Sequence, residues 1–314
     1  MPSVNLWLGG TSGDASVAAN WSEGIPGNGD DVIVPPHATN GIIAGMDAIA
    51  GSTLRSFWVQ DGFTKNIGNT AGGFFQVDLS SSDATHFRFE GNSTLARFHF
   101  IKTLQTLPIE VRKTGVGNPG QPAFQMITND INTAGGVYMG TVSVYSGEVA
   151  FGPDKKLCEV AGLVIGSDAE SGDAVVDIGE NCRDDTSDGL LLNLWVNSGT
   201  VNCSTMAVNI DQHGGEINHT GKNITTLSLY GGVTKLQNPS GASGGNVIAT
   251  LNLRGGTLDN SDNPSVKTIT NANLHAGAIQ DPLGKLVWTN PVVFKNKMGD
   301  VEFDFGPERT VTIA

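Results

Sequence analysis

The chain repeats one short phrase: an apolar residue, any residue, a small residue, glycine, any residue and an apolar residue. From Gly199 onward the repeated glycines fall at positions 199, 215, 232, 256 and 277. A repeat of about 20 residues matches one coil of a β-solenoid, in which each coil contributes short strands and glycine-assisted corners. The clearest copies are Val144-Tyr-Ser-Gly-Glu-Val149, Val196-Asn-Ser-Gly-Thr-Val201, Leu253-Arg-Gly-Gly-Thr-Leu258 and Leu274-His-Ala-Gly-Ala-Ile279.

The residues before each glycine alternate between apolar and polar side chains. In Leu227-Ser-Leu229 and Leu251-Asn-Leu253, a period of two places the leucines on one face and Ser or Asn on the other. Glycine adopts positive φ and lets two backbones approach closely, so it turns the chain at a corner. One coil cannot bury its apolar residues alone, whereas stacked coils bury whole columns of them. The repeat therefore predicts an all-β solenoid of parallel coils.

Turn signals divide the chain into three parts. We expect an N-terminal cap and first coil over residues 1–40 and a solenoid body over residues 41–280. Residues 281–314 hold four short apolar runs. Because an open solenoid end exposes strand edges, we expect these strands to cap the body or to exchange with a neighbouring copy. Clusters of Gly, Pro, Ser and Asp predict loop insertions near 112–135, 166–190 and 238–246.

Composition and charge narrow the classes of partner. Glycine contributes 42 of 314 residues and charged residues only 16%, which is typical of an all-β chain with many turns. The formal net charge is −13 at pH 7. A nucleic-acid partner requires a basic track, and the sequence contains none. Docking on an anionic membrane surface is disfavoured for the same reason.

The cysteines and the N-terminus indicate where the protein folds. Cys158, Cys182 and Cys203 are an odd number at wide spacing, and match neither a zinc pattern nor a disulfide framework. We expect reduced, packed thiols, which suit a bacterial-type cytoplasm. The first residues lack a basic region followed by an apolar run, and no apolar stretch approaches transmembrane length. The expectation is a protein that is neither secreted through an N-terminal signal nor inserted in a membrane.

The N-terminal part of the chain, positions 1–40, carries the most distinctive local sequence. Tryptophan and paired glycines in Leu6-Trp7-Leu8-Gly9-Gly10 are followed by Asn20-Trp21-Ser22, a Gly-Ile25-Pro26-Gly turn and Asp30-Asp31-Val-Ile-Val34. This order resembles the opening coil of bacterial and bacteriophage right-handed β-helical proteins. In secreted members the motif follows a signal peptide, whereas in phage-encoded relatives it begins the polypeptide, as it does here. The similarity is close within this N-terminal part and extends to the later coils in general pattern.

The resemblance implies a non-enzymatic structural protein of a phage virion. A decoration or cement protein on a capsid would contact the major capsid protein and copies of itself, with a homotrimer expected at three-fold lattice sites. It would need no cofactor or metal, would assemble in the host cytoplasm and would reside in the virion. Two other classes remain open. One is a tail fibre or tailspike-type appendage that binds or cleaves host surface glycan, and the other is a bacterial adhesin passenger.

Four N-terminal residues are the predicted structural cap. Trp7 and Trp21 supply large apolar rings that are expected to cover the open end of the solenoid core. Pro26 turns the chain with the glycines that follow it. Asp31 leads into residues 32–34, predicted as the first strand and stopped by two prolines. We interpret Gly27-Asn-Gly-Asp-Asp31 as a turn rather than a calcium site, because it occurs once and lacks tandem copies.

One concentration of positive character interrupts the acidic sequence. In His86-Phe-Arg88-Phe and Arg97-Phe-His99-Phe, His and Arg alternate with Phe and are predicted to form a row on one sheet surface. The functional interpretation is a contact face for an acidic partner or for another copy of the chain. The alternative is an ordinary solvated sheet face.

The sequence offers little support for an enzyme. It has no phosphate-cradling glycine loop ending in Lys-Ser or Lys-Thr, and no dinucleotide fingerprint before a helix. His213, His219 and His275 lie near glycine corners at a spacing wrong for one zinc site, so we interpret them as solvated corner histidines. The acidic loops around Asp168 and Asp184 are the candidate source of a glycosidase carboxylate pair, or are simply solvated.

Overall fold

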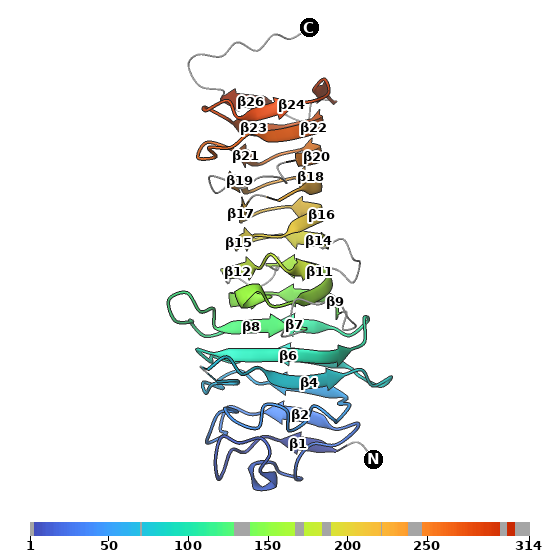
Figure 1. Cartoon of the computed structure of the whole chain (residues 1–314), viewed down its shortest axis with the longest axis vertical. Helices are drawn as coiled ribbons and strands as arrows, with labels where there is room; N and C mark the ends of the chain where they lie inside the picture. Colours follow the sequence, from blue (N-terminus) through green and yellow to red (C-terminus); the bar gives the residue numbers. More distant parts are fainter. Residues whose placement is uncertain are drawn as a thin grey trace.

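The computed structural model describes residues 3–69, 71–128, 139–166, 173–183, 190–220, 222–237, 247–295 and 300–304. The described chain is an all-β stack of short strands, and Figure 1 shows it as a long rod with the N-terminal strands at one end and β26 at the other. Two single-turn 3₁₀ helices, Ala18–Asn20 and Pro153–Lys155, are the only helical segments among these residues. Neither of them is long or apolar enough to cross a membrane.

The strands form two long sheets in which every assigned strand pair is parallel. Sheet 1 has 15 strands: β1 (Val4–Leu6), β2 (Asp31–Val34), β3 (Ser56–Val59), β5 (His86–Phe89), β7 (Ile109–Val111), β9 (Met139–Val144), β11 (Cys158–Ile165), β14 (Leu190–Val196), β16 (Met206–Gln212), β18 (Ile224–Leu229), β20 (Val247–Leu253), β22 (Lys267–Leu274) and β24 (Leu286–Trp288), with β13 (Cys182–Arg183) beside β11 and β25 (Val293–Phe294) beside β22. Sheet 2 has 11 strands: β4 (Phe75–Leu79), β6 (Ala96–Thr103), β8 (Phe124–Ile127), β10 (Gly147–Phe151), β12 (Ala174–Ile178), β15 (Thr200–Cys203), β17 (Glu216–Thr220), β19 (Val233–Gln237), β21 (Thr257–Asp259), β23 (Gly277–Gln280) and β26 (Val301–Asp304).

Each coil of the body takes one strand from each sheet. The chain runs along a strand of sheet 1, turns at a glycine corner into sheet 2, and returns through a second corner to the next strand of sheet 1 (Figure 1). The register follows the sequence repeat, since Leu194 pairs with Ile210, Ile210 with Leu227, and Leu227 with Leu251. The predicted solenoid of parallel coils is confirmed.

A column of glycines forms the corner between sheet 1 and sheet 2. Gly199, Gly215, Gly232, Gly256 and Gly277 all have positive φ, between +69° and +115°. A Cβ on Gly215 would lie 2.4 Å from the carbonyl oxygen of Gly199, and one on Gly232 would lie 2.4 Å from that of Gly215. Stacked coils therefore meet backbone to backbone at this corner, and both the conformation and the contact require glycine.

The core lies between the two sheets and consists of columns of inward side chains. Residues that are register partners on successive strands point inward together, because period-two alternation is kept from coil to coil. In the N-terminal half the columns are aromatic, and most aromatic side chains point inward as the alternation predicts. The ring centroids of Phe87 and Phe100 are 4.9 Å apart, and Phe98 stacks on Phe124 at 5.6 Å. The fully buried rings of this cluster are Phe57, Phe75, Phe87, Phe89, Phe98, Phe100 and Phe124.

Several element predictions need adjustment. The run predicted as the first strand is β2, because β1 precedes it and pairs with it from Val4 to Leu6. Of the four C-terminal runs, three correspond to β24, β25 and β26, while Thr310-Val-Thr-Ile313 lies outside the described residues. The inserted loop at 238–246 also lies outside them. The loop predicted near 166–190 instead contains strands β12 and β13, and only its residues 167–172 and 184–189 lie outside the described residues.

The close contacts in the glycine column imply that adding a side chain there lowers the free energy of unfolding. In Gly232→Ala, the new methyl group would meet the Gly215 carbonyl oxygen and the Gln212 amide, at 2.4 and 2.8 Å, while φ stays at +75°. Left-handed backbone costs an L-residue roughly 1–2 kcal/mol. Overpacking adds about 1–3 kcal/mol. We expect the free energy of unfolding, measured by urea denaturation, to fall by about 2–5 kcal/mol.

Gly10→Ala is the matched control, because Gly10 has no positive φ and a Cβ there meets no atom within 4 Å. It is expected to change stability by less than about 0.5 kcal/mol. Equal unfolding midpoints for the two variants would show that the corner contact does not constrain the fold.

Candidate functional site

The four predicted cap residues lie in the first coils and are tied into them by hydrogen bonds. Trp7 and Trp21 are buried edge-to-face with centroids 4.9 Å apart, and each indole N–H donates to a backbone carbonyl. The carbonyl of Pro26 accepts a hydrogen bond from Ser52. Asp31 forms an ion pair with Arg55 and accepts a hydrogen bond from Ser56.

The neighbouring Asp30 supports the interpretation of residues 27–31 as a turn. Its carboxylate accepts hydrogen bonds from the Gly27 amide at 2.9 Å and from the Ser3 hydroxyl at 2.7 Å. Although burial alone would raise the pKa of Asp30, these hydrogen bonds hold it below its usual value. The carboxylate is thus engaged in closing a turn.

The predicted row of His86, Arg88, Arg97 and His99 does not lie on one sheet. His86 and Arg88 belong to β5 in sheet 1, whereas Arg97 and His99 belong to β6 in sheet 2. The prediction is wrong because consecutive strands of a coil enter different sheets, so sequence neighbours are not surface neighbours. The two halves of the row also have different surroundings.

Neither half is a free basic face. Arg88 donates to Glu110 at 3.1 Å, within a group of charges that includes Arg112. Arg97 is only 4% exposed, donates to the Asn69 carbonyl and lies over the Phe74 ring. The His99 ring contacts the Thr128 carbonyl at 3.2 Å. These side chains are thus largely committed to contacts within the protein.

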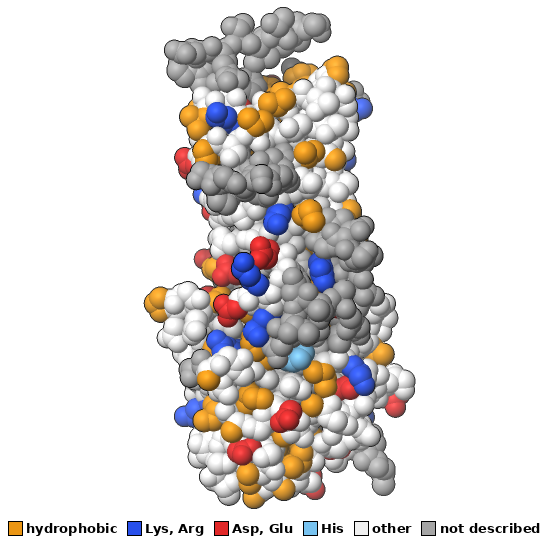
Figure 2. All heavy atoms as spheres, viewed as in Figure 1, with side chains coloured by type: hydrophobic (Ala, Val, Ile, Leu, Met, Phe, Trp, Pro, Cys, Tyr) orange, Lys and Arg blue, Asp and Glu red, His pale blue; other side chains and the backbone are white. Residues whose placement is uncertain are grey.

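A projecting arm is the most prominent departure from the regular coil. Residues 113–122 lie within the loop predicted at 112–135, and the arm stands out from the side of the rod at the level of β8 (Figures 1 and 2). Its tip is a tight turn in which the Gln121 amide donates to the Asn118 carbonyl at 2.8 Å. Val116 near the tip is 75% exposed. The predicted loop is too long, because Phe124–Ile127 within it form the buried strand β8, and its last part, from residue 129, lies outside the described residues.

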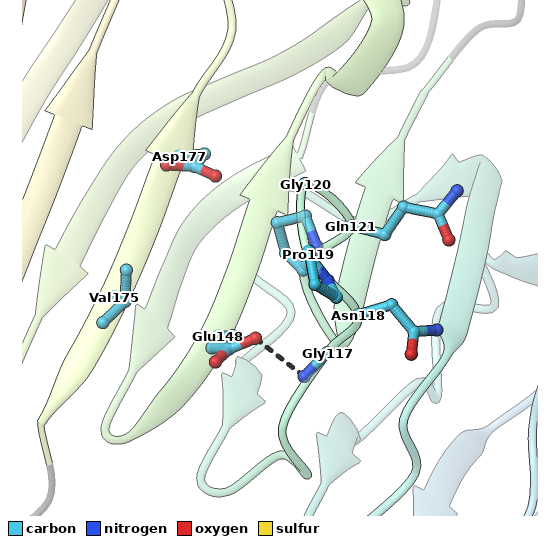
Figure 3. Close-up of a pocket in the computed structure, with 9 residues that line it drawn as sticks. Gly117, Asn118, Pro119, Gly120, Gln121, Glu148, Val175 and Asp177 are labelled. Atoms are coloured by element: carbon cyan, nitrogen blue, oxygen red, sulfur yellow. Dashed lines mark hydrogen bonds between the residues drawn. The ribbon is translucent and has the colours of Figure 1, made fainter.

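The arm is fastened to sheet 2 by Glu148 on β10. The Glu148 carboxylate accepts a hydrogen bond from the Gly117 amide at 2.7 Å (Figure 3). The backbone amide of Glu148 donates to the Thr114 hydroxyl at 2.8 Å. Gly117 must be glycine, because a Cβ there would lie 2.1 Å from the Gln121 carbonyl oxygen. A charged acceptor and a close backbone contact thus hold the arm in one position.

Two adjoining hollows lie between the arm and the outer face of sheet 2. The first, of about 350 Å³, is bordered by the arm and by Glu148, Val175 and Asp177 (Figure 3). The second, of about 460 Å³, extends the groove past residues 150–155 toward Asn202. Gly120, Pro122 and Asp177 border both hollows, so together they form one groove, which we call the arm groove.

Backbone strain is concentrated on one wall of the arm groove. Asp154 and Lys155, at φ of +54° and +64°, are the two non-glycine residues with positive φ in the described part of the chain. Both line the second hollow. Strained backbone persists only where the surrounding structure over-determines it, and such positions cluster at binding sites. The arm groove is therefore the best candidate functional site.

The chemistry of the arm groove is polar and acidic. In the described part of its lining, Glu148, Asp154, Asp177 and Glu180 supply carboxylates and Lys155 is the one cation, paired with Glu180 at 3.4 Å. Among the described residues that line it, no aromatic ring is exposed for stacking on a sugar, since Phe151 is buried. The predicted alternative carboxylates, Asp168 and Asp184, lie outside the described residues.

The three corner histidines have different environments. His213 is exposed and His275 is half-buried, as expected of corner residues. His219 is fully buried on β17, so its interpretation as a solvated histidine is wrong. His219 points into the core because it is an inward residue of β17, in the same column as Cys203 and Leu236 on the neighbouring coils. Its nearness to a glycine in the sequence does not show this. The described residues contain no group of three or more His, Cys, Asp or Glu side chains arranged to hold a metal.

His219 and Lys267 are buried ionisable groups without a compensating carboxylate partner in the described part of the chain. No side chain pairs with the His219 ring there, and a backbone hydrogen bond at Thr205 only partly offsets the effect of burial. Burial, reinforced by the Lys267 charge, lowers the pKa of His219 to about 3. Lys267 is 2% exposed and donates to the Lys222 carbonyl at 3.1 Å, and burial lowers its pKa to about 8. The sequence pattern alone did not reveal either group as buried.

The three cysteines are free and buried, as predicted. Cys158 and Cys182 are register partners on β11 and β13. A hydrogen bond with Cys158 and burial raise the pKa of Cys182, and burial raises the pKa of Cys203 to about 12. Protonated, inaccessible thiols act as small apolar groups in the core.

Comparison of the chain with protein-family models, with curated proteins and with solved structures found no match.

Removing the Glu148 anchor should loosen the arm. Hydrogen bonds to charged groups contribute about 1.5–3 kcal/mol, so Glu148→Ala should increase the open population of the arm roughly tenfold or more. We expect faster tryptic cleavage after Lys113, followed by mass spectrometry. Glu148→Gln keeps an acceptor oxygen for the Gly117 amide and should remain close to the parent. Equal cleavage rates in all three proteins would contradict the anchoring role.

Burial of His219 should make stability fall in acid. The folded pKa of about 3 lies below the ordinary 6.5, so the unfolded chain takes up a proton first as pH falls from 6.5 toward 3. The free energy of unfolding should decrease through this window. His219→Leu removes the titration and a poorly paired polar ring from the core. It should therefore also raise the free energy of unfolding at neutral pH by about 1–3 kcal/mol.

His219→Asn serves as the control, because it removes the titration but keeps a buried polar group. Urea unfolding at several pH values between 4 and 7 should show a weaker pH dependence for both variants and a gain at neutral pH for His219→Leu alone. An unchanged pH dependence in His219→Leu would contradict the assignment.

Proposed function

We propose that this chain is a non-enzymatic structural protein of a bacteriophage virion. In this proposal it is a right-handed β-helical decoration protein that cements the capsid surface, and it is assembled in the host cytoplasm. Two features support it. The opening residues with Trp7, Trp21, Pro26 and Asp31 resemble the first coil of phage β-helical proteins, and the solenoid supplies a stiff body.

The observation that carries the proposal is the anchored arm. A segment that projects from a rigid scaffold, and that is held in place before it meets a partner, binds with a smaller loss of conformational entropy. Its exposed Val116 supplies an apolar contact, and the arm groove beside it supplies polar groups. Such an arm suits contact with a major capsid protein on a neighbouring lattice position.

Contacts with further copies are proposed at the two ends of the rod. In this proposal Trp7 and Trp21 cap the N-terminal end, and the strands from residue 281 cap the other end or exchange with a neighbour. Each end carries exposed apolar side chains, which mark interaction surfaces when they gather in one region. At the N-terminal end they are Val4, Val17, Ile25 and Ile43, and at the C-terminal end Val266, Leu283, Val287, Val293 and Phe294. A homotrimer is the assembly we propose.

A tail appendage that binds or cleaves host glycan is the second candidate, and the arm groove favours it. Glu148 and Asp177 face this groove from adjacent strands and are offset by two residues in register. A strand spacing of about 4.8 Å and a rise of roughly 3.3 Å per residue place their Cα atoms about 8 Å apart. Inverting glycosidases hold their carboxyl groups roughly 6.5–9.5 Å apart.

Light scattering and co-sedimentation test the proposal. The protein is expected to be a trimer in solution and to pellet at a fixed ratio with undecorated shells of the coat protein encoded in the same genome. Val116→Asp places a charge in the arm contact and should weaken shell binding roughly tenfold, the effect of losing about 1.4 kcal/mol of apolar burial. Thr225→Asp introduces the same charge at an exposed position of β18, away from the arm and from the two ends of the rod.

Each outcome discriminates between the two candidates. Weaker shell binding for Val116→Asp but not for Thr225→Asp supports the cement role. The cement role is overturned if the protein does not pellet with shells and instead cleaves a host surface polysaccharide. Loss of that cleavage in Glu148→Gln and Asp177→Asn would then establish the second candidate.

A further inference from the structure

A ridge of stacked aromatic and cationic side chains runs along the glycine corner. Each ridge residue directly follows a strand of sheet 1, and its backbone amide donates to the preceding coil, for example Tyr230 to the Gln212 carbonyl and Arg254 to the Leu229 carbonyl. Successive rungs are therefore about 4.8 Å apart along the rod. The corner ridge consists of His213, Tyr230, Arg254, His275 and Lys295.

The ridge is ordered by stacking. The rings of His213 and Tyr230 are parallel within 6°, with centroids 4.5 Å apart, and the Arg254 guanidinium lies 5.2 Å from the Tyr230 centroid. Tyr230 is 40% exposed, and His213, Arg254 and Lys295 are exposed as well. Because the ring faces are occupied by one another, the ridge presents ring and guanidinium edges to solvent. Those edges carry hydrogen-bond donors.

The cations of the ridge are not neutralised by the described part of the protein. Neither Arg254 nor Lys295 has an ion-pair partner among the described residues, whereas Lys235 nearby is paired with Glu216 at 2.7 Å. At physiological salt the Debye length is about 8 Å, so the more distant carboxylates of this acidic protein are screened from a ligand on the ridge. The guanidinium edge of Arg254 is suited to a carboxylate, which it binds in bidentate geometry.

A second line of polar groups lies beside the ridge on the outer face of sheet 1. Ser228, Asn252 and Asn273 each precede a ridge residue by two positions and form a hydrogen-bonded ladder, with separations of 3.4 and 2.9 Å. Each amide has two N–H donors and the ladder uses one of them, so the other is available to a hydroxyl. One coil earlier the same position holds Asp211. A carboxylate ligand is therefore favoured on the later coils, from Tyr230 onward.

We propose that the corner ridge and its amide ladder bind an acidic polysaccharide that lies along the rod axis. Uronate carboxylates meet Arg254 and Lys295, and sugar hydroxyls meet the ladder amides. An extended peptide fits less well. Peptides bind sheet proteins through free strand edges, whereas the backbone N–H groups of the ridge residues already donate to the preceding coil. Weak contacts on successive rungs add together along a polymer. The inference does not depend on the proposed role in the virion.

Affinity electrophoresis through gels containing polygalacturonate tests the inference, with dextran as the neutral polymer and poly-glutamate as the peptide polyanion. The parent is expected to be retarded by polygalacturonate alone, with less retardation as salt increases. Arg254→Gln with Lys295→Gln should weaken binding roughly tenfold or more, since each removes a charge-assisted contact. Circular dichroism spectra should confirm that the variants are folded.

Lys102→Gln is the matched control, because it removes an exposed cation of β6 in the other sheet. Retained binding in this variant, together with loss in the double variant, supports the inference. Absence of retardation in the parent, or equal weakening by Lys102→Gln, overturns it. Stronger retardation by poly-glutamate than by polygalacturonate also overturns it, and identifies the ridge as a site for an acidic protein segment.

Discussion

The backbone contact at the glycine corner is the constraint on which the rest of the structure depends. At each glycine of this corner φ is positive, and an added Cβ would lie 2.4–2.7 Å from a carbonyl oxygen of the preceding coil. Once this contact sets the spacing, each strand pairs in register with the strand one coil away. The inward columns, the ridge at the corner and the outer ladders are consequences of the same repeat. The step from Gly232 to Gly256 is longer than the step from Gly199 to Gly215, because the register fixes the strands and leaves the length of their connections free.

The alternation of sheets decides which residues become neighbours. Consecutive strands enter different sheets, so a surface is assembled from residues one coil apart rather than from one stretch of sequence. The expected basic row divides between β5 and β6 for this reason, and Arg97 becomes buried. The same geometry brings Tyr230 between His213 and Arg254, although each of the three belongs to a different coil.

Energetically unfavourable features are found at a few defined places on an otherwise regular body. Asp154 and Lys155 hold left-handed backbone where the arm groove passes the second corner. His219 and Lys267 place ionisable groups in the core between sheets of apolar columns. The coils tolerate this unfavourable free energy because each strand pairs along its length with the strands of the coils before and after it. The strained wall coincides with the candidate site, whereas the buried histidine lies within the core itself.

The fold class, the corners and most strands could be predicted from the sequence, because a repeat of glycine and period-two alternation has few other ways to bury its apolar residues. The sequence also predicted the inward aromatics and the buried thiols, which follow from the same alternation. The sheet to which each strand belongs became clear only from the folded chain, and with it the separation of His86 and Arg88 from Arg97 and His99. The folded chain also shows that Glu148 fastens the arm, that Asp154 and Lys155 are strained, and that His219 points inward. These depend on contacts between residues far apart in the chain, and local periodicity carries no information about which coil, and which side of it, such residues share.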